Sequence, residues 1–236
     1  MGDLFSFDKF LRIVQEYAPY FRQGALYTVI LAAAAIFLGF VFALLITSLR
    51  MSRFRVLRGI ALSYVEVIRG TPILVQLMII YYGVCTILPV PAVTIFGFIQ
   101  TSMFIPGTIA VACNSGAYVS EIIRSGILAV DKGQSEAARS LGMTQMQNMI
   151  RIVLPQAIKN ILPALGNEFV TIIKESSVCM VIGIPELMYN TNIAKGATFR
   201  TMEPLVIAAI IYFLLTFSIS KLIAYFERRM RRADRT

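Results

Sequence analysis

The sequence predicts an all-α polytopic membrane protein with about five transmembrane helices. Of its 236 residues, 57% are hydrophobic and only 15% are charged, whereas soluble domains carry about 25% charged residues. Uncharged runs extend from Gln23 to Leu49 and from Gly70 to Ser120, and about 20 apolar residues suffice to cross a bilayer. The first run can therefore hold one span, and the second can hold most of two.

The basic residues predict the orientation of these spans. Four arginines follow the first span at residues 50–58, and five follow the last at residues 228–235. Cytoplasmic loops beside membrane helices carry an excess of Lys and Arg. We therefore expect the N-terminus outside and the C-terminus in the cytoplasm. The net charge of +9 does not indicate a nucleic-acid partner, because no folded soluble surface is expected to present it.

Residues 5–22 are expected to form an interfacial helix before the first span. Apolar residues recur there at helical spacing from Phe7 to Tyr17, and the charged residues fall largely on the other side. The segment is too short and too charged for a span or a signal peptide. An amphipathic helix lying on the outer surface of the bilayer fits it better.

Residues 24–226 are expected to form one core, with no internal repeat and no second domain. The predicted spans are residues 24–49, 56–87, 106–128, 161–184 and 204–226. Pro106 suits the first turn of the third span. The whole chain, residues 1–236, is thus expected to be a single transmembrane domain that ends in a basic cytoplasmic tail, residues 227–236.

Two connections between the spans are expected on the outer side. Residues 88–104 carry no charge and are expected to form a re-entrant or outer-surface connection. Residues 186–203 are polar and of mixed charge, which favours an outer segment. Within the second span, Gly70, Thr71 and Pro72 interrupt the apolar pattern.

The residue types that catalysis most often uses are absent or scattered. The chain has no His and no GxxxxGK[ST] phosphate-binding loop, so neither Ser-His or Cys-His catalysis nor ATP hydrolysis by this chain is expected. Cys85, Cys113 and Cys179 form no CxxC pair and are expected to be buried packing residues. We therefore expect neither an enzyme nor a metal site.

A polar loop at residues 131–155 separates the third and fourth spans. Ser135 is a suitable N-cap for a short helix, and Gly142 suits the left-handed position that ends it. A capping box is expected at Thr144 and Gln147. This chemistry predicts helix, turn, helix. The loop could dock a partner, or it could be a solvated connection between two spans.

This loop resembles the EAA loop of ATP-binding-cassette importer permeases. The family pattern is EAA, three residues, Gly, nine residues, Ile-x-Leu-Pro, and it is met without departure by Glu136, Ala137, Ala138, Gly142, Ile152, Leu154 and Pro155. Segments 69–76, 115–121 and 165–169 also resemble the polar amino-acid uptake subgroup.

The resemblance implies partners as well as a role for the loop. In that family the EAA loop forms a coupling helix that sits in a cleft of a separate ATPase subunit. Two such subunits would bind ATP and Mg, and this chain would bind no cofactor. An extracytoplasmic binding protein would deliver the amino acid. The chain would lie in a bacterial inner membrane, paired with a second copy of itself or with a related permease.

Polar residues at membrane depth are candidates for the substrate pathway, because such groups normally face a cavity or a partner. The candidates are Asn114, Tyr118, Glu121, Glu168, Lys174 and Glu175. The first three share one helix face. A zwitterionic substrate needs an acceptor for its ammonium group and a donor for its carboxylate, and this set offers both.

Other roles stay open for the acidic and basic residues of the fourth span. Glu168 could form a salt bridge to a neighbouring helix. If it lines the pathway instead, a cationic side chain such as that of arginine or lysine is favoured. The substrate is thus expected to be a polar amino acid, either a cationic one (arginine, lysine or histidine) or glutamine or glutamate. Lys174 and Glu175 could serve gating or subunit packing.

The sequence thus predicts the membrane subunit of an ATP-driven importer for a polar amino acid, working by alternating access. An ion-gradient-driven secondary transporter is the alternative, but the internal repeats typical of such proteins are not found. A membrane-embedded enzyme is disfavoured because no nucleophile has a base in reach.

Overall fold

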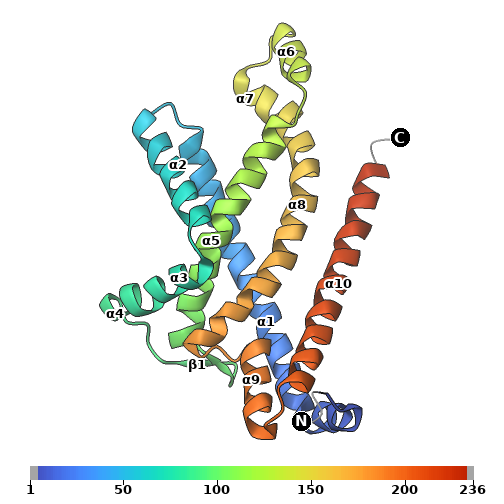
Figure 1. Ribbon diagram of the computed structural model, residues 1–236. Coiled ribbons are helices and arrows are strands. Elements are labelled where there is room, and N and C mark those ends of the chain that lie inside the picture. The colour runs from blue at the N-terminus through green and yellow to red at the C-terminus, as the bar shows by residue number, and fades with distance from the viewer. Residues whose placement is uncertain (1–4, 233–236) are drawn as a thin grey trace.

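The computed structural model describes residues 5–232, which form a bundle of helices and one short hairpin (Figure 1). The helices are α1 (Phe7–Arg50), α2 (Arg55–Gly70), α3 (Ile73–Met78), α4 (Cys85–Ile87), α5 (Thr101–Leu128), α6 (Lys132–Ser140), α7 (Gln145–Asn148), α8 (Leu154–Glu175), α9 (Leu187–Thr198) and α10 (Met202–Arg232). Two π-helical turns, η1 (Ile79–Val84) and η2 (Met149–Val153), and the 3₁₀ helix η3 (Ser176–Ile182) lie between them. The strands β1 (Thr94–Ile95) and β2 (Ile99–Gln100) pair antiparallel. The predicted all-α fold class is confirmed.

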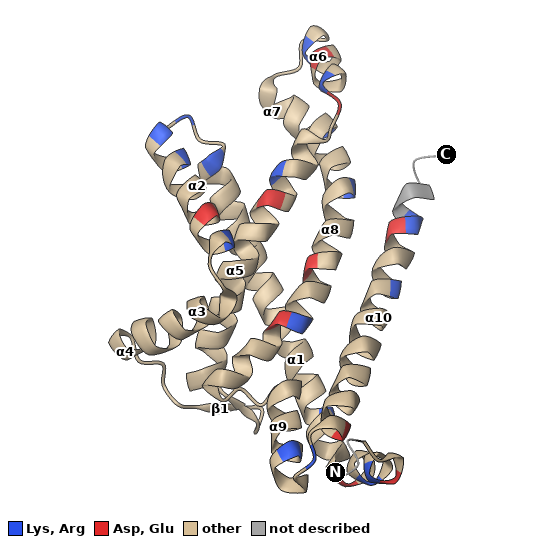
Figure 2. Ribbon diagram, viewed as in Figure 1, with Lys and Arg blue, Asp and Glu red and all other residues tan. Residues whose placement is uncertain are grey.

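The molecule has two different ends. Figure 1 shows the α1–α2 turn, α6, α7 and the C-terminal end of α10 at one end, and α9, the hairpin and the first turns of α1 at the other. Figure 2 shows basic residues gathered at the first end, on the α1–α2 turn and around α6. The predicted orientation needs these basic segments to lie at the same end of the molecule, and they do. Which end faces the cytoplasm stays a prediction. Residues 233–236 of the predicted basic tail lie outside the described residues.

Helix α1 joins two segments that the sequence analysis separates. It runs without a break through 44 residues and contains Pro19. A proline removes one helical hydrogen bond and bends a helix without always ending it. Figure 1 shows the first turns of α1, in dark blue, lying across the direction of the rest. The placement of residues 5–22 on a membrane surface stays a prediction.

The predicted second span is sharply bent at the interruption that Gly70, Thr71 and Pro72 make in it, and whether it crosses the membrane as one span stays a prediction. Helix α2 ends at Gly70 and the next helix begins at Ile73, and the two helical segments on either side of this break are bent by 110°. Pro72 takes an extended conformation there, and proline also disfavours a helical conformation at the residue before it. The interruption at Gly70, Thr71 and Pro72 marks where the helix ends, but it does not predict the bend, because hydropathy reports the environment of a segment and not its direction.

Other helix boundaries also differ from the predicted spans. Helix α5 begins five residues before Pro106, which therefore lies inside the helix and not in its first turn. Helix α8 begins at Leu154 and ends at Glu175, where η3 takes over until Gly183, whose φ is +87°. The predicted outer segment contains α9. A helix ends where its last backbone N–H and C=O groups find hydrogen-bond partners outside the helix. Such a position need not coincide with a change in hydropathy along the sequence.

Helices α1 and α10 are long and apolar enough to cross a membrane, and the bent pair of α2 with the segment after it is a third candidate. Helices α5 and α8 have 28 and 22 residues, enough to cross at 1.5 Å per residue, but they are more polar. The chain is an integral membrane protein, and the number of five spans stays a prediction.

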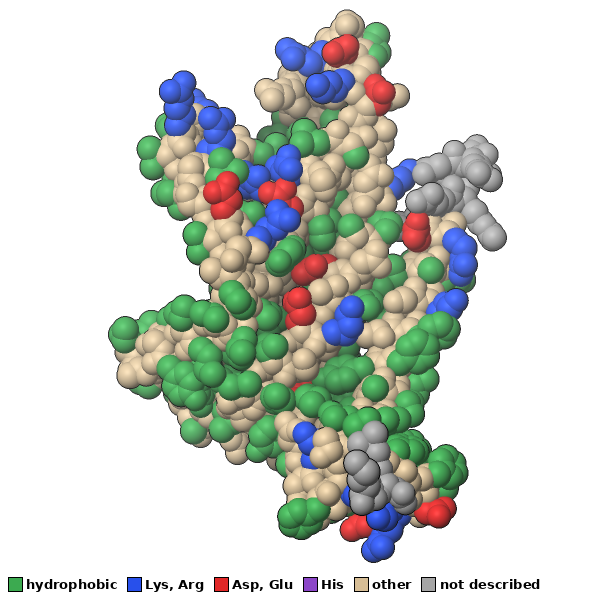
Figure 3. Space-filling view, in the orientation of Figure 1, with side chains coloured by type: hydrophobic (Ala, Val, Ile, Leu, Met, Phe, Trp, Pro, Cys, Tyr) green, Lys and Arg blue, Asp and Glu red, His purple; other side chains and the backbone are tan. Residues whose placement is uncertain are grey.

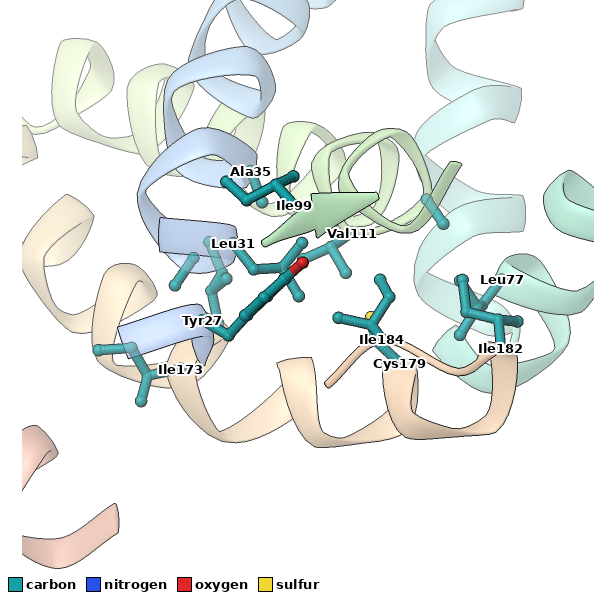
Figure 4. Packing of buried hydrophobic residues seen from close by; sticks show 13 residues of the cluster. Tyr27, Leu31, Ala35, Leu77, Ile99, Val111, Ile173, Cys179, Ile182 and Ile184 are labelled. Atoms are coloured by element: carbon teal, nitrogen blue, oxygen red, sulfur yellow. The ribbon is translucent and has the colours of Figure 1, made fainter. Parts of the chain in front are cut away.

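Small residues allow α1 and α5 to pack closely, as in many membrane helix pairs. Ala32, Ala35, Gly39 and Ala43 follow one buried face of α1. A Cβ atom at Gly39 would lie 3.1 Å from the carbonyl oxygen of Ala112 on α5. Figure 4 shows the main core beside this contact, where side chains of α1, α5 and the η3 region meet around Tyr27.

Candidate functional site

The polar loop at residues 131–155 forms two short helices at one end of the molecule (Figure 1). Helix α6 begins one turn earlier than predicted, because Asp131 and not Ser135 is its N-cap. The Asp131 carboxylate accepts a hydrogen bond from the backbone N–H of Gly133 at 2.6 Å, and Ser135 lies inside the helix. Both residue types are good N-caps, so local preference alone does not decide between them.

The turn and the second helix start follow the prediction. Gly142 has a φ of +86°, which costs a residue with a side chain about 1–2 kcal/mol. The Thr144 N–H donates to Gln147 Oε1 at 2.9 Å, and the Gln147 N–H donates to Thr144 Oγ1 at 3.3 Å. The left-handed glycine and the capping box are both confirmed.

The tip of this loop presents apolar side chains to its surroundings. Leu141 is 84% exposed and Met146 is 69% exposed. Glu136 and Ala137 are exposed as well, whereas Ala138 is buried within the chain. Exposed apolar groups on an otherwise polar element are typical of a partner surface. The exposed face of the loop therefore includes Ala137 and Leu141, one helical turn apart, whereas Ala138 packs inside the chain in this conformation.

The second half of the motif shapes the entry into α8. Ile152 is half-buried at the end of η2, and Leu154 and Pro155 are exposed at the start of α8. Proline cannot donate a helical hydrogen bond and its ring crowds the carbonyl group of the preceding turn. A widened π turn before Pro155 accommodates this. Ile152, Leu154 and Pro155 therefore belong to η2 and to the start of α8, and they are not part of helix α6.

Two of the candidates for the substrate pathway contact α2 and α3. The Asn114 side chain is buried and donates to Gln76 Oε1 at 3.0 Å. The Gln76 amide in turn donates to the carbonyl oxygens of Ile68 at 2.8 Å and Thr71 at 3.0 Å, so this pair holds the bend after α2. The guanidinium group of Arg69 lies 5.3 Å from the centre of the Tyr118 ring.

Glu121 forms an ion-pair cluster with Arg50 at the end of α1 and with Arg124 one turn along α5. The Arg124 Nη2 atom lies 2.9 Å from Glu121 Oε2. Only 11% of the Arg50 side chain is exposed, and removing one member of a buried ion pair leaves an uncompensated charge. In this conformation the carboxylate is engaged within the chain, so it is poorly placed to receive a substrate ammonium group.

The remaining candidates, Glu168, Lys174 and Glu175, lie on α8. The residues that contact them were not predicted from the sequence. Glu168 and Glu175 are half-buried, seven residues apart on one side of the helix. Glu168 interacts with the side chain of Ser115 on α5. The Ser115 hydroxyl group is buried within the chain, whereas Glu168 is only partly buried, so the Glu168 carboxylate is the group of this pair that a ligand can reach.

Lys174 lies at a separate cavity of about 490 Å³. Its lining residues are Leu74, Lys174, Ser177, Val178, Met180, Val181, Met188 and Tyr212. Figure 3 shows charged side chains of both signs close together at the middle of this face of the molecule, among hydrophobic ones. The structure thus places Lys174 next to Glu175 on α8, and it brings Glu168 to Ser115, the residue beside Asn114 on α5.

Comparison with known proteins assigns the family. The model of the binding-protein-dependent transport system inner membrane component matches residues 35–232. The chain belongs to this family. The predicted resemblance to importer permeases is therefore confirmed, and the chain is the membrane component of such a system and not its ATPase.

Individual relatives of this membrane component cover nearly all of its length. It is 38% identical over 216 residues to the arginine transport system permease protein ArtQ of Bacillus subtilis (strain 168), with 92% of this chain and 94% of the relative covered. It is 40% identical over 208 residues to the putative glutamine transport system permease protein GlnP of Rickettsia conorii, with 88% and 91% covered. A solved amino acid ABC transporter structure with histidines matches at 46% identity and a TM-score of 0.84, covering 93% of this chain and 98% of that one.

A buried carboxylate that the sequence analysis missed joins α9 to α10 in this membrane component, and the residue after it joins α9 to α1. Glu186 is fully buried at the start of α9, where it accepts hydrogen bonds from the Met188 N–H at 2.9 Å, the Tyr189 N–H at 2.7 Å and the Tyr212 hydroxyl group of α10 at 2.8 Å. The Leu187 N–H donates to Thr28 of α1 at 3.2 Å. An acidic residue just before a helix is typical of an N-cap. This pattern at Glu186 was the sequence signal from which its role could have been predicted.

Burial raises the pKa of Glu186 to about 7, although its three hydrogen-bond donors act in the opposite direction. The protonated form is therefore favoured by folding. This contribution to stability is fully present below the ordinary Glu pKa of about 4.3 and is lost as the pH rises through about 7. A shift of this size corresponds to roughly 3 kcal/mol.

We expect the thermal stability of the detergent-solubilised protein to decrease between about pH 5 and pH 8, and Glu186→Gln to reduce this dependence. The measurement is the fraction that stays monodisperse in size-exclusion chromatography after heating at each pH. Glu16→Gln, which changes an exposed carboxylate in a surface ion pair, should keep the wild-type dependence. An equally steep dependence in the Glu186→Gln protein would contradict this assignment.

Proposed function

We propose that this chain is the membrane-spanning subunit of an ATP-driven importer that moves a polar amino acid into a bacterial cell across its inner membrane. The observation that carries the proposal is the EAA loop. In this family member the loop forms a capped helix, α6, and an exposed leucine follows directly after it. Arginine and glutamine are named in the descriptions of the relatives given above, and both are polar amino acids.

The loop is connected to the helices that carry the candidate substrate residues. Helix α6 follows α5 after three residues, and η2 leads directly into α8. A Cβ atom at Gly126 of α5 would lie 2.4 Å from Ile161 Cγ1 of α8, so the two helices pack tightly just below the loop. Force applied to α6 by a partner would therefore move α5 and α8 together, and with them Ser115 and Glu168.

The charges on α8 favour a substrate with a positive group. Glu168 and Glu175 can accept hydrogen bonds from an ammonium or guanidinium group, and charge-assisted hydrogen bonds are stronger than neutral ones. Lys174, at the cavity beside them, can donate to a substrate carboxylate. With two carboxylates and one ammonium group in this region, we favour a cationic amino acid such as arginine, lysine or histidine over glutamine or glutamate.

Two ATPase subunits would bind ATP and Mg and receive the EAA loops of two permease chains, either two copies of this one or this one and a related permease. An extracytoplasmic binding protein would deliver the substrate. Closure of the ATPase subunits would favour the outward-facing state, and a ligand shifts such an equilibrium only through its different affinities for the two states.

The test is uptake of radiolabelled arginine, lysine, histidine, glutamine and glutamate into vesicles that contain the chain with or without its ATPase subunits. We expect uptake only when both the ATPase subunits and ATP are present, with cationic amino acids taken up best. Uptake without ATPase subunits, driven by an ion gradient, would instead establish a secondary transporter. Preference for glutamine or glutamate would retain the importer and overturn the role assigned to the α8 carboxylates.

A further inference from the structure

A groove of about 480 Å³ lies between the first turns of α1 and the start of α10. It is lined by Phe10, Val14, Ala18, Phe21, Arg22, Ala25, Ile207, Ile210 and Ile211. The α1 members follow helical spacing along one side, so the groove is a continuous apolar surface with a single arginine among its lining residues. Its volume lies within the range typical of small-ligand pockets.

The opposite side of the same helical segment is polar. There a separate pocket of about 310 Å³ is lined by residues that include Lys9, Arg12, Glu16 and Arg200. The first turns of α1 therefore separate a polar pocket toward α9 from an apolar groove toward α10. Most of α10 is unburied within the chain, and it is one of the helices able to cross a membrane. The groove thus opens toward a surface that hydrocarbon covers.

Arg22 is exposed at this groove, and no described residue forms an ion pair or a hydrogen bond with it. The residues lining the groove include no acidic side chain. Arg22 directly precedes the apolar run that begins at Gln23. A basic side chain at this position can extend its charged end to the level of the lipid headgroups while its stem lies on apolar surface.

We propose that the groove binds an anionic phospholipid, with an acyl chain along its apolar wall and the headgroup phosphate against Arg22. An acyl chain has no polar groups to satisfy, whereas a peptide in the same place would bring backbone groups into hydrocarbon, where each unsatisfied group costs several kcal/mol. Arg22, the one charged residue among those lining the groove, selects a headgroup with a net negative charge. An amino acid, which is charged at both ends, does not fit an apolar groove.

The test uses the absence of Trp from this chain. Ile210→Trp places a fluorescent reporter in the groove of the complete transporter, reconstituted in mixed phosphatidylglycerol and phosphatidylcholine vesicles. One of the two lipids carries bromine atoms, which quench Trp fluorescence on contact. The transporter with an unaltered permease gives the background from partner subunits. Phe10→Trp, an aromatic exchange at the other end of the groove, serves as a second reporter if Ile210→Trp does not insert.

We expect a relative affinity for phosphatidylglycerol over phosphatidylcholine of about five at the groove, the value that one basic residue near a membrane surface supplies. Arg22→Gln should reduce this ratio to about one, and Arg22→Lys should retain it because the charge remains. Phe37→Trp, at a position of α1 that is 73% exposed and outside the groove, should give a ratio of about one. Equal quenching by both lipids at residue 210 would overturn the headgroup assignment, and no quenching by either would show that protein covers the groove.

Discussion

Leu141→Asp is expected to reduce ATP-driven uptake severely while the membrane helices remain folded. Leu141 is 84% exposed at the tip of the EAA loop, so the change removes no internal packing. Apolar anchors in the centre of an interface contribute roughly 2 kcal/mol or more, and a buried unpaired carboxylate adds a desolvation cost. Uptake at limiting ATPase concentration should therefore fall by a factor of about 30 or more. Co-purification of the ATPase subunits should decrease in parallel.

Gln145→Asp is the matched control for this prediction. It adds the same charge to the same loop at an exposed polar position of α7, so it should lower uptake far less than Leu141→Asp does. Equal expression and membrane insertion of both variants would exclude a folding defect. If Leu141→Asp binds its ATPase subunits and transports normally, the loop is only a connection between two helices.

Glu168→Gln is expected to weaken uptake of a cationic amino acid by about tenfold to one hundredfold. The change keeps the size of the side chain and removes its charge, and hydrogen bonds to charged groups contribute about 1.5–3 kcal/mol. The loss should appear mainly as a higher KM, because the interaction holds the substrate. ATPase activity in the absence of substrate should be unchanged. The measurement is initial uptake over a range of substrate concentrations.

The exposed pair of Arg12 and Glu16 offers the control for this second prediction. Glu16→Gln makes the same chemical change in the first turns of α1, where the salt bridge to Arg12 spans 3.6 Å and both side chains are more than half exposed. Surface pairs of this kind contribute little. Unchanged KM in the Glu168→Gln protein would show that Glu168 serves helix packing, the alternative that the sequence leaves open.

The local chemistry of the chain was sufficient to predict its class and its coupling loop. Hydropathy predicted a helical membrane protein, and Gly142, Thr144 and Gln147 predicted the turn and the second helix start correctly. These signals act over a few residues, so they can be read from the chain without knowing what packs against it. The seven motif residues were sufficient to indicate the family, although their contacts with an ATPase stay predictions.

Which polar groups from distant segments contact each other depends on how the helices pack. Asn114 and Glu121 share a helix face with Tyr118, yet the structure directs one to Gln76 and the other to Arg50. Contacts of this kind join residues far apart in the chain, and no local preference specifies them.

The same reason explains what was missed. The 110° bend after α2 depends on Gln76 held from α5, and the position of α9 depends on Glu186 bonded to Tyr212 of α10. A buried polar group must find a partner because leaving it unsatisfied costs about 1–3 kcal/mol. Local sequence signals were therefore sufficient to predict the kind of protein and the helix-turn-helix form of the EAA loop, whereas the pairing of polar groups between helices sets where the chain bends and which side chains engage one another.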